Sequence, residues 1–84
     1  MDAESRELER RTKAFALRIL ACVAGFRKTV VSDSIGYQLA RRGPSVGANC
    51  REANRAESRD DLIHKIGIIA KEACETCYWL ELRL

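Results

Sequence analysis

Residues 41–84 read RRGPSVGANCREANRAESRDDLIHKIGIIAKEACETCYWLELRL, and this half of the chain determines the fold. A Gly43-Pro44 pair is followed by a short polar and basic segment, and then by a long run whose apolar residues recur every three or four positions. This spacing predicts a helix over about residues 58–83. The helix is apolar on several sides, so it needs partner surfaces along much of its length.

The predicted last helix carries more apolar surface than a short chain can cover. One row should face the interior, and a second row beside it widens the apolar face. Exposed apolar patches of this kind mark partner surfaces, so we predict a homo-oligomer. Its expected interface residues are Ile68, Tyr78, Trp79, Leu82 and Leu84. The row expected to face inward is Leu62, Ile66, Ile69, Ala73, Cys77, Leu80 and Leu84.

Two further helical segments are predicted upstream. Apolar residues at helical spacing predict a helix over about residues 3–24. A second helix is expected over about residues 32–56, and Gly43-Pro44 either kinks it or breaks it in two, because proline lacks a backbone donor. Three helical units with short links predict an all-α, up-and-down antiparallel bundle, as a single domain over residues 1–84.

The length and composition of the chain indicate a small single-domain protein. A chain of 84 residues buries only about 60–65% of its unfolded surface, so oligomerisation would add needed stability. The N-terminus is charged and no apolar run approaches the length of a membrane span, so a cytoplasmic protein without a membrane partner is expected. In that compartment the four cysteines are expected to be reduced.

Arginines gather around the middle of the chain. Arg51, Arg55 and Arg59 fall at intervals of four, on one stripe if the helix continues through them, and Arg41 and Arg42 lie just upstream. Such a ridge can follow a phosphate backbone of RNA or DNA. It can equally pair with acids of another helix, another subunit or another protein, or form a solvated face, since glutamates are interleaved with it.

The cysteines and the single histidine do not indicate a catalytic or metal site. Cys74 and Cys77 form a C-x-x-C pair, but it lies deep in a helix rather than at its N-terminus, and the further ligands that a zinc site needs are scattered. His64 has no implied catalytic partner. We therefore expect no enzymatic activity, no metal site and no cofactor.

Residues 43–82 carry a resemblance to a known bacterial family of four-helix-bundle proteins, first met as reading frames in intervening sequences of 23S ribosomal RNA genes. The chain is also similar, more distantly, to the accessory variability protein of diversity-generating retroelements. The resemblance lies in Arg11-Thr12-Lys13-Ala14-Phe15-Ala16, Ser45-Val46-Gly47-Ala48-Asn49, Arg51-Glu52-Ala53, Arg55-Ala56, Ser58, Lys65, Gly67, Lys71-Glu72-Ala73, Glu75-Thr76 and Tyr78-Trp79-Leu80-Glu81-Leu82.

This resemblance implies an up-and-down bundle that assembles into a homo-oligomer, a five-membered ring in known relatives, without enzymatic activity. The retroelement relative is a basic adaptor that binds nucleic acid and a reverse transcriptase, which implies a role for Arg41, Arg51, Arg55 and Arg59 here. Family members continue beyond the W-L-E-L segment into a fourth helix, whereas this chain ends at Leu84. The groove for that helix should therefore be open, and another subunit is expected to fill it.

Overall fold

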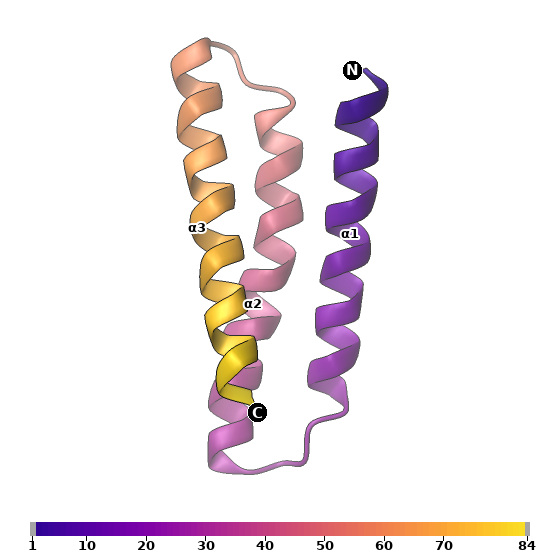
Figure 1. Cartoon of the computed structure of the whole chain (residues 1–84), viewed down its shortest axis with the longest axis vertical. Coiled ribbons are helices and arrows are strands. Elements are labelled where there is room, and N and C mark those ends of the chain that lie inside the picture. Colours follow the sequence, from indigo (N-terminus) through magenta and orange to yellow (C-terminus); the bar gives the residue numbers. More distant parts are fainter. Residues whose placement is uncertain (1, 84) are drawn as a thin grey trace.

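A computed structural model describes residues 2–83, and within this range the chain forms three α-helices and no strand. Helix α1 spans Ala3–Ala24, α2 spans Val30–Ala53 and α3 spans Arg59–Arg83. The chain runs down, up and down again, so α1 and α3 point in the same direction on either side of α2 (Figure 1). The predicted all-helical, three-helix fold is confirmed.

Each helix begins at a polar residue whose side chain accepts a backbone N–H of the first turn. This satisfies one of the donors that a helix N-terminus leaves unpaired. Because its cap lies upstream of the segment expected from the sequence, α2 starts at Val30 rather than near residue 32. The three capping pairs are Asp2 with Ser5 at 2.7 Å, Thr29 with Ser32 at 3.0 Å, and Ser58 with Asp61 at 3.0 Å.

The Gly43-Pro44 pair does not break α2, which is one continuous helix with Pro44 inside it. Proline removes one backbone donor and crowds the preceding turn. Packing on both sides offsets this cost, because α2 is the middle helix and contacts both α1 and α3. Helical stability in proteins comes mostly from such tertiary packing.

The three helices do not all pack on one another. Helix α2 packs on both neighbours, whereas no Cα of α1 lies within 8 Å of a Cα of α3 in the described range. The Cα positions extend over 44 × 22 × 15 Å. In Figure 1, α3 passes in front of α2, so the side on which α1 and α3 flank an opening faces the reader. We call this side the open face.

Buried apolar residues extend along α2 as far as Val46, Cys50 and Ala53, and one cluster of them lies at the half of the bundle that contains the α1–α2 connection. Ile19, Ile35 and Leu39 are buried together there. Helix α3 contacts this cluster near its own C-terminus. The partly buried residues packed on the cluster are Phe15, Val23, Phe26, Trp79 and Leu80.

Candidate interaction surface

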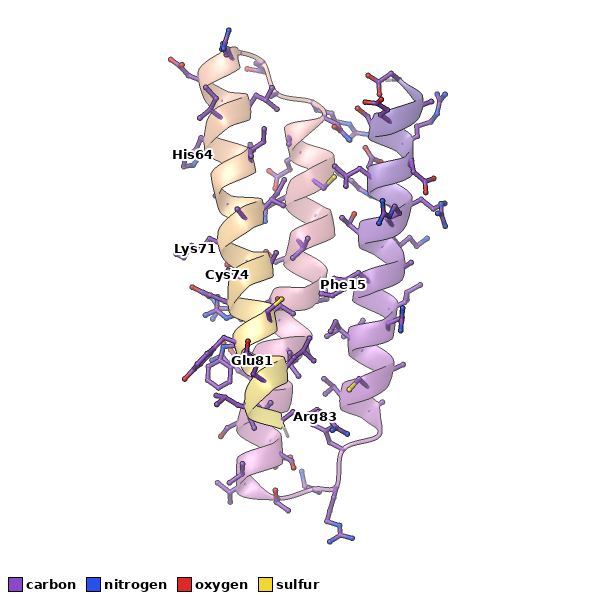
Figure 2. All side chains as sticks on the ribbon, in the orientation of Figure 1. Phe15, His64, Lys71, Cys74, Glu81 and Arg83 are labelled. Carbon is purple, nitrogen blue, oxygen red and sulfur yellow. The ribbon has the colours of Figure 1, made fainter. Side chains whose placement is uncertain are left out.

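The open face contains a hollow of about 540 Å³ between α1 and the C-terminal part of α3. Figure 2 shows Phe15 pointing from α1 toward α2, where it forms part of this hollow. The hollow combines an apolar floor with guanidinium groups along the α1 side. Its lining residues are Arg10, Arg11, Ala14, Phe15, Arg18 and Ile19 from α1, and Leu80 from α3.

The arginines beside the hollow differ in their partners. Arg10 donates from Nη2 to the Glu7 carboxylate at 2.5 Å. This hydrogen bond lowers the pKa of Glu7 and raises that of Arg10. Arg11 and Arg18 are exposed, and neither pairs with an acid within residues 2–83. Arg11 and Arg18 therefore border an apolar hollow without forming an ion pair in this part of the chain.

Helix α3 is rotated away from the orientation that its aliphatic row predicts. The N-terminal part of the row expected to face inward is open, with Leu62 38% and Ile66 52% exposed, and Ile63 beside it is 59% exposed. Further along the same row, Ile69, Ala73 and Leu80 are half-buried. Instead α3 turns a mixed polar and apolar face toward α2. Thr76 is fully buried there, and its hydroxyl donates to the Glu72 carbonyl at 2.7 Å.

An ionic cluster at the α2–α3 contact accounts for this rotation. The Arg42 guanidinium forms an ion pair with Glu72 at 3.4 Å and a second one with Glu75. Its Nε also donates to Gln38 at 2.9 Å, and its side chain is only 21% exposed. The polar side of α3 must face α2 to make these contacts. Arg42, which the sequence places on a nucleic-acid ridge, thus joins two helices.

The remaining arginines of the predicted ridge do not lie on one helical stripe. Helix α2 ends at Ala53, so Arg55 lies in the connection and Arg59 opens α3. Arg51 lies 3.8 Å from Glu9 of α1 and is half exposed. The stripe ends because the chain turns after Ala53, next to an Asn54 side chain that donates to Glu9 at 2.7 Å.

The side chains that remain available from this ridge are Arg41, Arg55 and Arg59. All three are exposed, and none has an acidic partner in the part of the chain that the structure describes. A hollow at the α2–α3 connection includes Arg55 together with the acids Glu57 and Asp61. The local charge around the connection is therefore mixed rather than uniformly basic.

The predicted oligomer-interface residues divide between two environments. Ile68 is half-buried, and Trp79 packs on the core cluster. Tyr78 is 54% and Leu82 46% exposed, and the Tyr78 ring meets that of Trp79 edge to face at 5.6 Å. Leu84 lies outside the described residues. The structure therefore leaves Tyr78 and Leu82 available to a partner.

Sequence reasoning missed the part of the open face that α1 provides. Leu8 is 50% exposed, and Arg11, Phe15 and Arg18 follow it at intervals of three, four and three. This spacing places all four on one side of a helix, a signal that was present in the sequence. Its meaning depends on the neighbour, since only the placement of Leu80 shows which side of α1 faces α3.

The thiols and the histidine do not converge. Cys74 and Cys77 are exposed on α3, while Cys22 is half-buried and Cys50 is buried. Figure 2 shows His64 on the edge of α3 that faces away from α1. Over residues 2–83, His, Cys, Asp and Glu side chains form no group of three or more that could hold a metal ion. No helix in this range has the length and apolarity to cross a membrane.

The fold and surface define a small helical-bundle protein with an open apolar face. The chain belongs to the 23S rRNA-intervening sequence protein family, whose model matches residues 4–84. A solved structure of a protein of unknown function from the S23 ribosomal protein family of Bacteroides thetaiotaomicron is 40% identical and superposes with a TM-score of 0.79. The match covers 93% of this chain and 70% of that one. A comparison with curated proteins gives no significant match.

Proposed function

We propose that this protein is a non-enzymatic helical assembly module that self-associates. The observation that carries the proposal is the open face, together with the exposure of the aliphatic side chains Leu8, Leu62, Ile63 and Ile66, which are 38–59% exposed. Stable domains normally consist of at least two packed layers around a shared core. A partner subunit on the open face would cover these side chains and complete the shared core.

The total surface area of the chain supports this proposal. The accessible surface is 6158 Å² for a mass of 9.5 kDa. A compact monomer of that mass exposes about 5,000 Å² by the usual scaling of surface with mass. The excess of roughly 1,100 Å² exceeds the area of about 800 Å² that each partner buries in a standard protein interface. Burial of one interface of standard size would therefore bring the accessible surface of the chain close to that of a compact monomer of the same mass.

Multi-angle light scattering across a concentration series tests this function. We expect a mass that is an integer multiple of the 9.5 kDa chain at micromolar concentration, and the multiple gives the ring or dimer size, five included. The mass should not change when reducing agent is added, because the proposed contacts are apolar and ionic rather than disulfides. A mass of 9.5 kDa throughout the series would contradict the proposal.

RNA or DNA binding is a second candidate function, favoured by the exposed and unpaired guanidiniums of Arg41, Arg55 and Arg59. Arginine at such positions pairs with phosphate. The name of the family refers to the 23S rRNA intervening sequence, which makes RNA the first probe to use.

Fluorescence anisotropy with a labelled mixed-sequence RNA and the matching DNA tests this second function. The triple variant Arg41→Ala, Arg55→Ala, Arg59→Ala should bind more weakly and with a smaller salt dependence, because counterion release scales with the number of phosphates contacted. A matched control removes three other exposed cations, Arg27, Lys28 and Lys71. Equal loss in both variants, or no binding at low salt, would exclude a specific role for the three arginines.

A further inference from the structure

Cys74 and Cys77 lie on the surface of α3 rather than in the core. The sequence places Cys77 in the row expected to face inward, where a free thiol packs as a small apolar side chain. In the structure both residues are exposed, whereas Cys50 is buried. The packing of the bundle therefore does not account for the pair, and both thiols are accessible to solutes.

The helix brings the two thiols to one side of α3, which runs without interruption through both positions. Residues three apart in a helix are neighbours, with Cβ atoms about 5–6 Å apart. A disulfide needs Cβ atoms about 3.5–4.5 Å apart, so its formation would require the helix to distort. A single metal ion is less demanding, because two sulfurs bound to it at about 2.3 Å each can lie as much as about 4.6 Å apart.

The turn that carries the pair is fixed to α2. Thr76, which lies between the two cysteines, is fully buried, and its hydroxyl donates to the Glu72 carbonyl at 2.7 Å. Glu75, the other intervening residue, forms an ion pair with Arg42. These contacts hold the backbone between the two thiols in place before a ligand arrives. Preorganisation of this kind lowers the entropy cost of binding.

The number of available ligands selects the class of metal ion. A structural zinc site takes four protein ligands. Over residues 2–83, His, Cys, Asp and Glu side chains form no group of three or more that could hold a metal ion. Cu(I) is a soft ion that favours thiolates, and two of them in a linear arrangement satisfy its coordination. The pair therefore matches Cu(I) and not Zn²⁺.

Binding of Cu(I) by two thiols releases two protons and leaves a complex with one net negative charge. Lys71 precedes Cys74 by three residues and is exposed at the neighbouring level of α3 (Figure 2), so its ammonium group can offset this charge. Glu81 follows Cys77 by four residues and is also exposed. Carboxylate oxygens are ligands for harder ions, so Glu81 does not replace either thiolate.

We propose that Cys74 and Cys77 form a surface site that binds one Cu(I) ion through their two thiolates. The ion remains open on its solvent side to a third thiolate, so it can exchange with thiols of another molecule. This inference is independent of the self-association and the RNA binding proposed above, because neither proposal uses these two side chains.

Anaerobic titration of the reduced, full-length protein with Cu(I), in competition with a chromogenic Cu(I) chelator, tests the site. The wild-type chain should withdraw one Cu(I) from the chelator. Cys74→Ser and Cys77→Ser should each weaken binding about a hundredfold or more, because the second thiolate no longer binds intramolecularly. Cys22→Ser is the matched control. Cys22 is half-buried on another helix, so this variant should bind as the wild type does.

A further variant moves one thiol without changing the number of thiols. In Cys77→Ser, Leu82→Cys the two thiols of α3 lie eight residues apart, which is about 12 Å along the helix axis. Leu82 is 46% exposed, so the fold should tolerate the change, and circular dichroism checks this. Cu(I) binding should be as weak as in Cys77→Ser. Wild-type affinity in this variant would show that the spacing is not required, and the site would be wrong.

The mass of the protein distinguishes a site within one chain from an ion shared between chains. Sedimentation equilibrium of the wild type should give the same mass with and without an equivalent of Cu(I). A mass that doubles when Cu(I) is added would overturn the proposed site, as would wild-type affinity in Cys74→Ser or retention of Zn²⁺ as tight as that of Cu(I). The mass of the metal-free protein, which reports on self-association, is measured separately in the same series.

Discussion

Ile19 of α1 lies directly against the backbone of Gly43 in α2. A Cβ added at position 43 would lie 2.9 Å from the Cγ2 of Ile19, closer than real Cβ atoms approach their neighbours. Ile19 is the one residue of α1 that is buried, at 5% exposure. A similar approach recurs one turn further on, where a Cβ at Gly47 would lie 3.3 Å from the Thr12 hydroxyl. The missing side chains therefore set the distance between α1 and α2.

We predict that Gly43→Ala lowers the free energy of unfolding by roughly 1–2 kcal/mol. The added methyl overpacks the contact, and the β-branched Ile19 has little rotamer freedom to move aside. Alanine's better helix propensity, about 1 kcal/mol, offsets part of the loss. Urea unfolding followed by circular dichroism at one fixed protein concentration measures the change, since association also shifts apparent stability.

Gly67→Ala provides the control for that experiment. Gly67 lies in α3, and a Cβ at this position would meet nothing within 4 Å. The same substitution should therefore stabilise the chain by about 0.5–1 kcal/mol through helix propensity alone. Opposite signs for the two variants are expected, and equal stabilisation by both would show that Ile19 does not constrain position 43.

The N-cap of α1 should respond to acid. The backbone N–H of Ser5 donates to the Asp2 carboxylate at 2.7 Å, and this hydrogen bond lowers the pKa of Asp2. A carboxylate with a lowered folded-state pKa stabilises the helix fully above its unfolded value of 3.8, and loses that contribution as pH falls through the folded value. The Ser5 amide resonance should therefore titrate below pH 3.8. In Asp2→Asn, which keeps an acceptor but does not titrate, that transition should be absent.

The end of α3 should depend on a contact with the α1–α2 connection. The Arg83 guanidinium carbon lies 5.1 Å from the centre of the Phe26 ring. We predict that Arg83→Gln lowers the free energy of unfolding by about 0.5–1 kcal/mol, the usual range for an exposed cation–π contact. Arg83→Lys should retain part of it because it keeps the charge. Thermal unfolding at high salt is the readout, and equal losses in Gln and Lys variants would point to packing of the arginine stem instead.

Local pattern was enough to predict the class of the fold. Three helices follow from apolar spacing, from polar caps such as Ser58, and from the absence of strand signals. The end of α2 was harder to place, because the four-residue spacing of Arg51, Arg55 and Arg59 imitates a continuing helix. The chain instead turns after Ala53, where Asn54 binds Glu9 of another helix. No local pattern contains that contact.

The orientation of α3 could not be read from its own sequence. Its aliphatic row has the stronger helical periodicity, and on that basis Ile66 is expected inside. The orientation is selected by Arg42, thirty residues before Glu72 in the chain, which binds the opposite side of α3. The apolar periodicity of one helix carries no information about an ion pair with a residue of another helix. The exposed aliphatic side chains, such as Ile66, therefore lie on the side of α3 away from that ion pair.

Removing Arg42 is therefore the most informative test of the fold. We predict that Arg42→Met lowers the free energy of unfolding by roughly 1–3 kcal/mol, because Glu72 and Glu75 are left partly buried without a cation between them. Arg41→Ala is the control, since Arg41 is exposed and unpaired within residues 2–83 and should change stability by less than about 0.5 kcal/mol. The triple variant Arg42→Met, Glu72→Gln, Glu75→Gln should recover part of the loss, because no uncompensated charge remains. If the triple variant is no more stable than Arg42→Met alone, the guanidinium stabilises α3 through packing of its stem rather than through its charge.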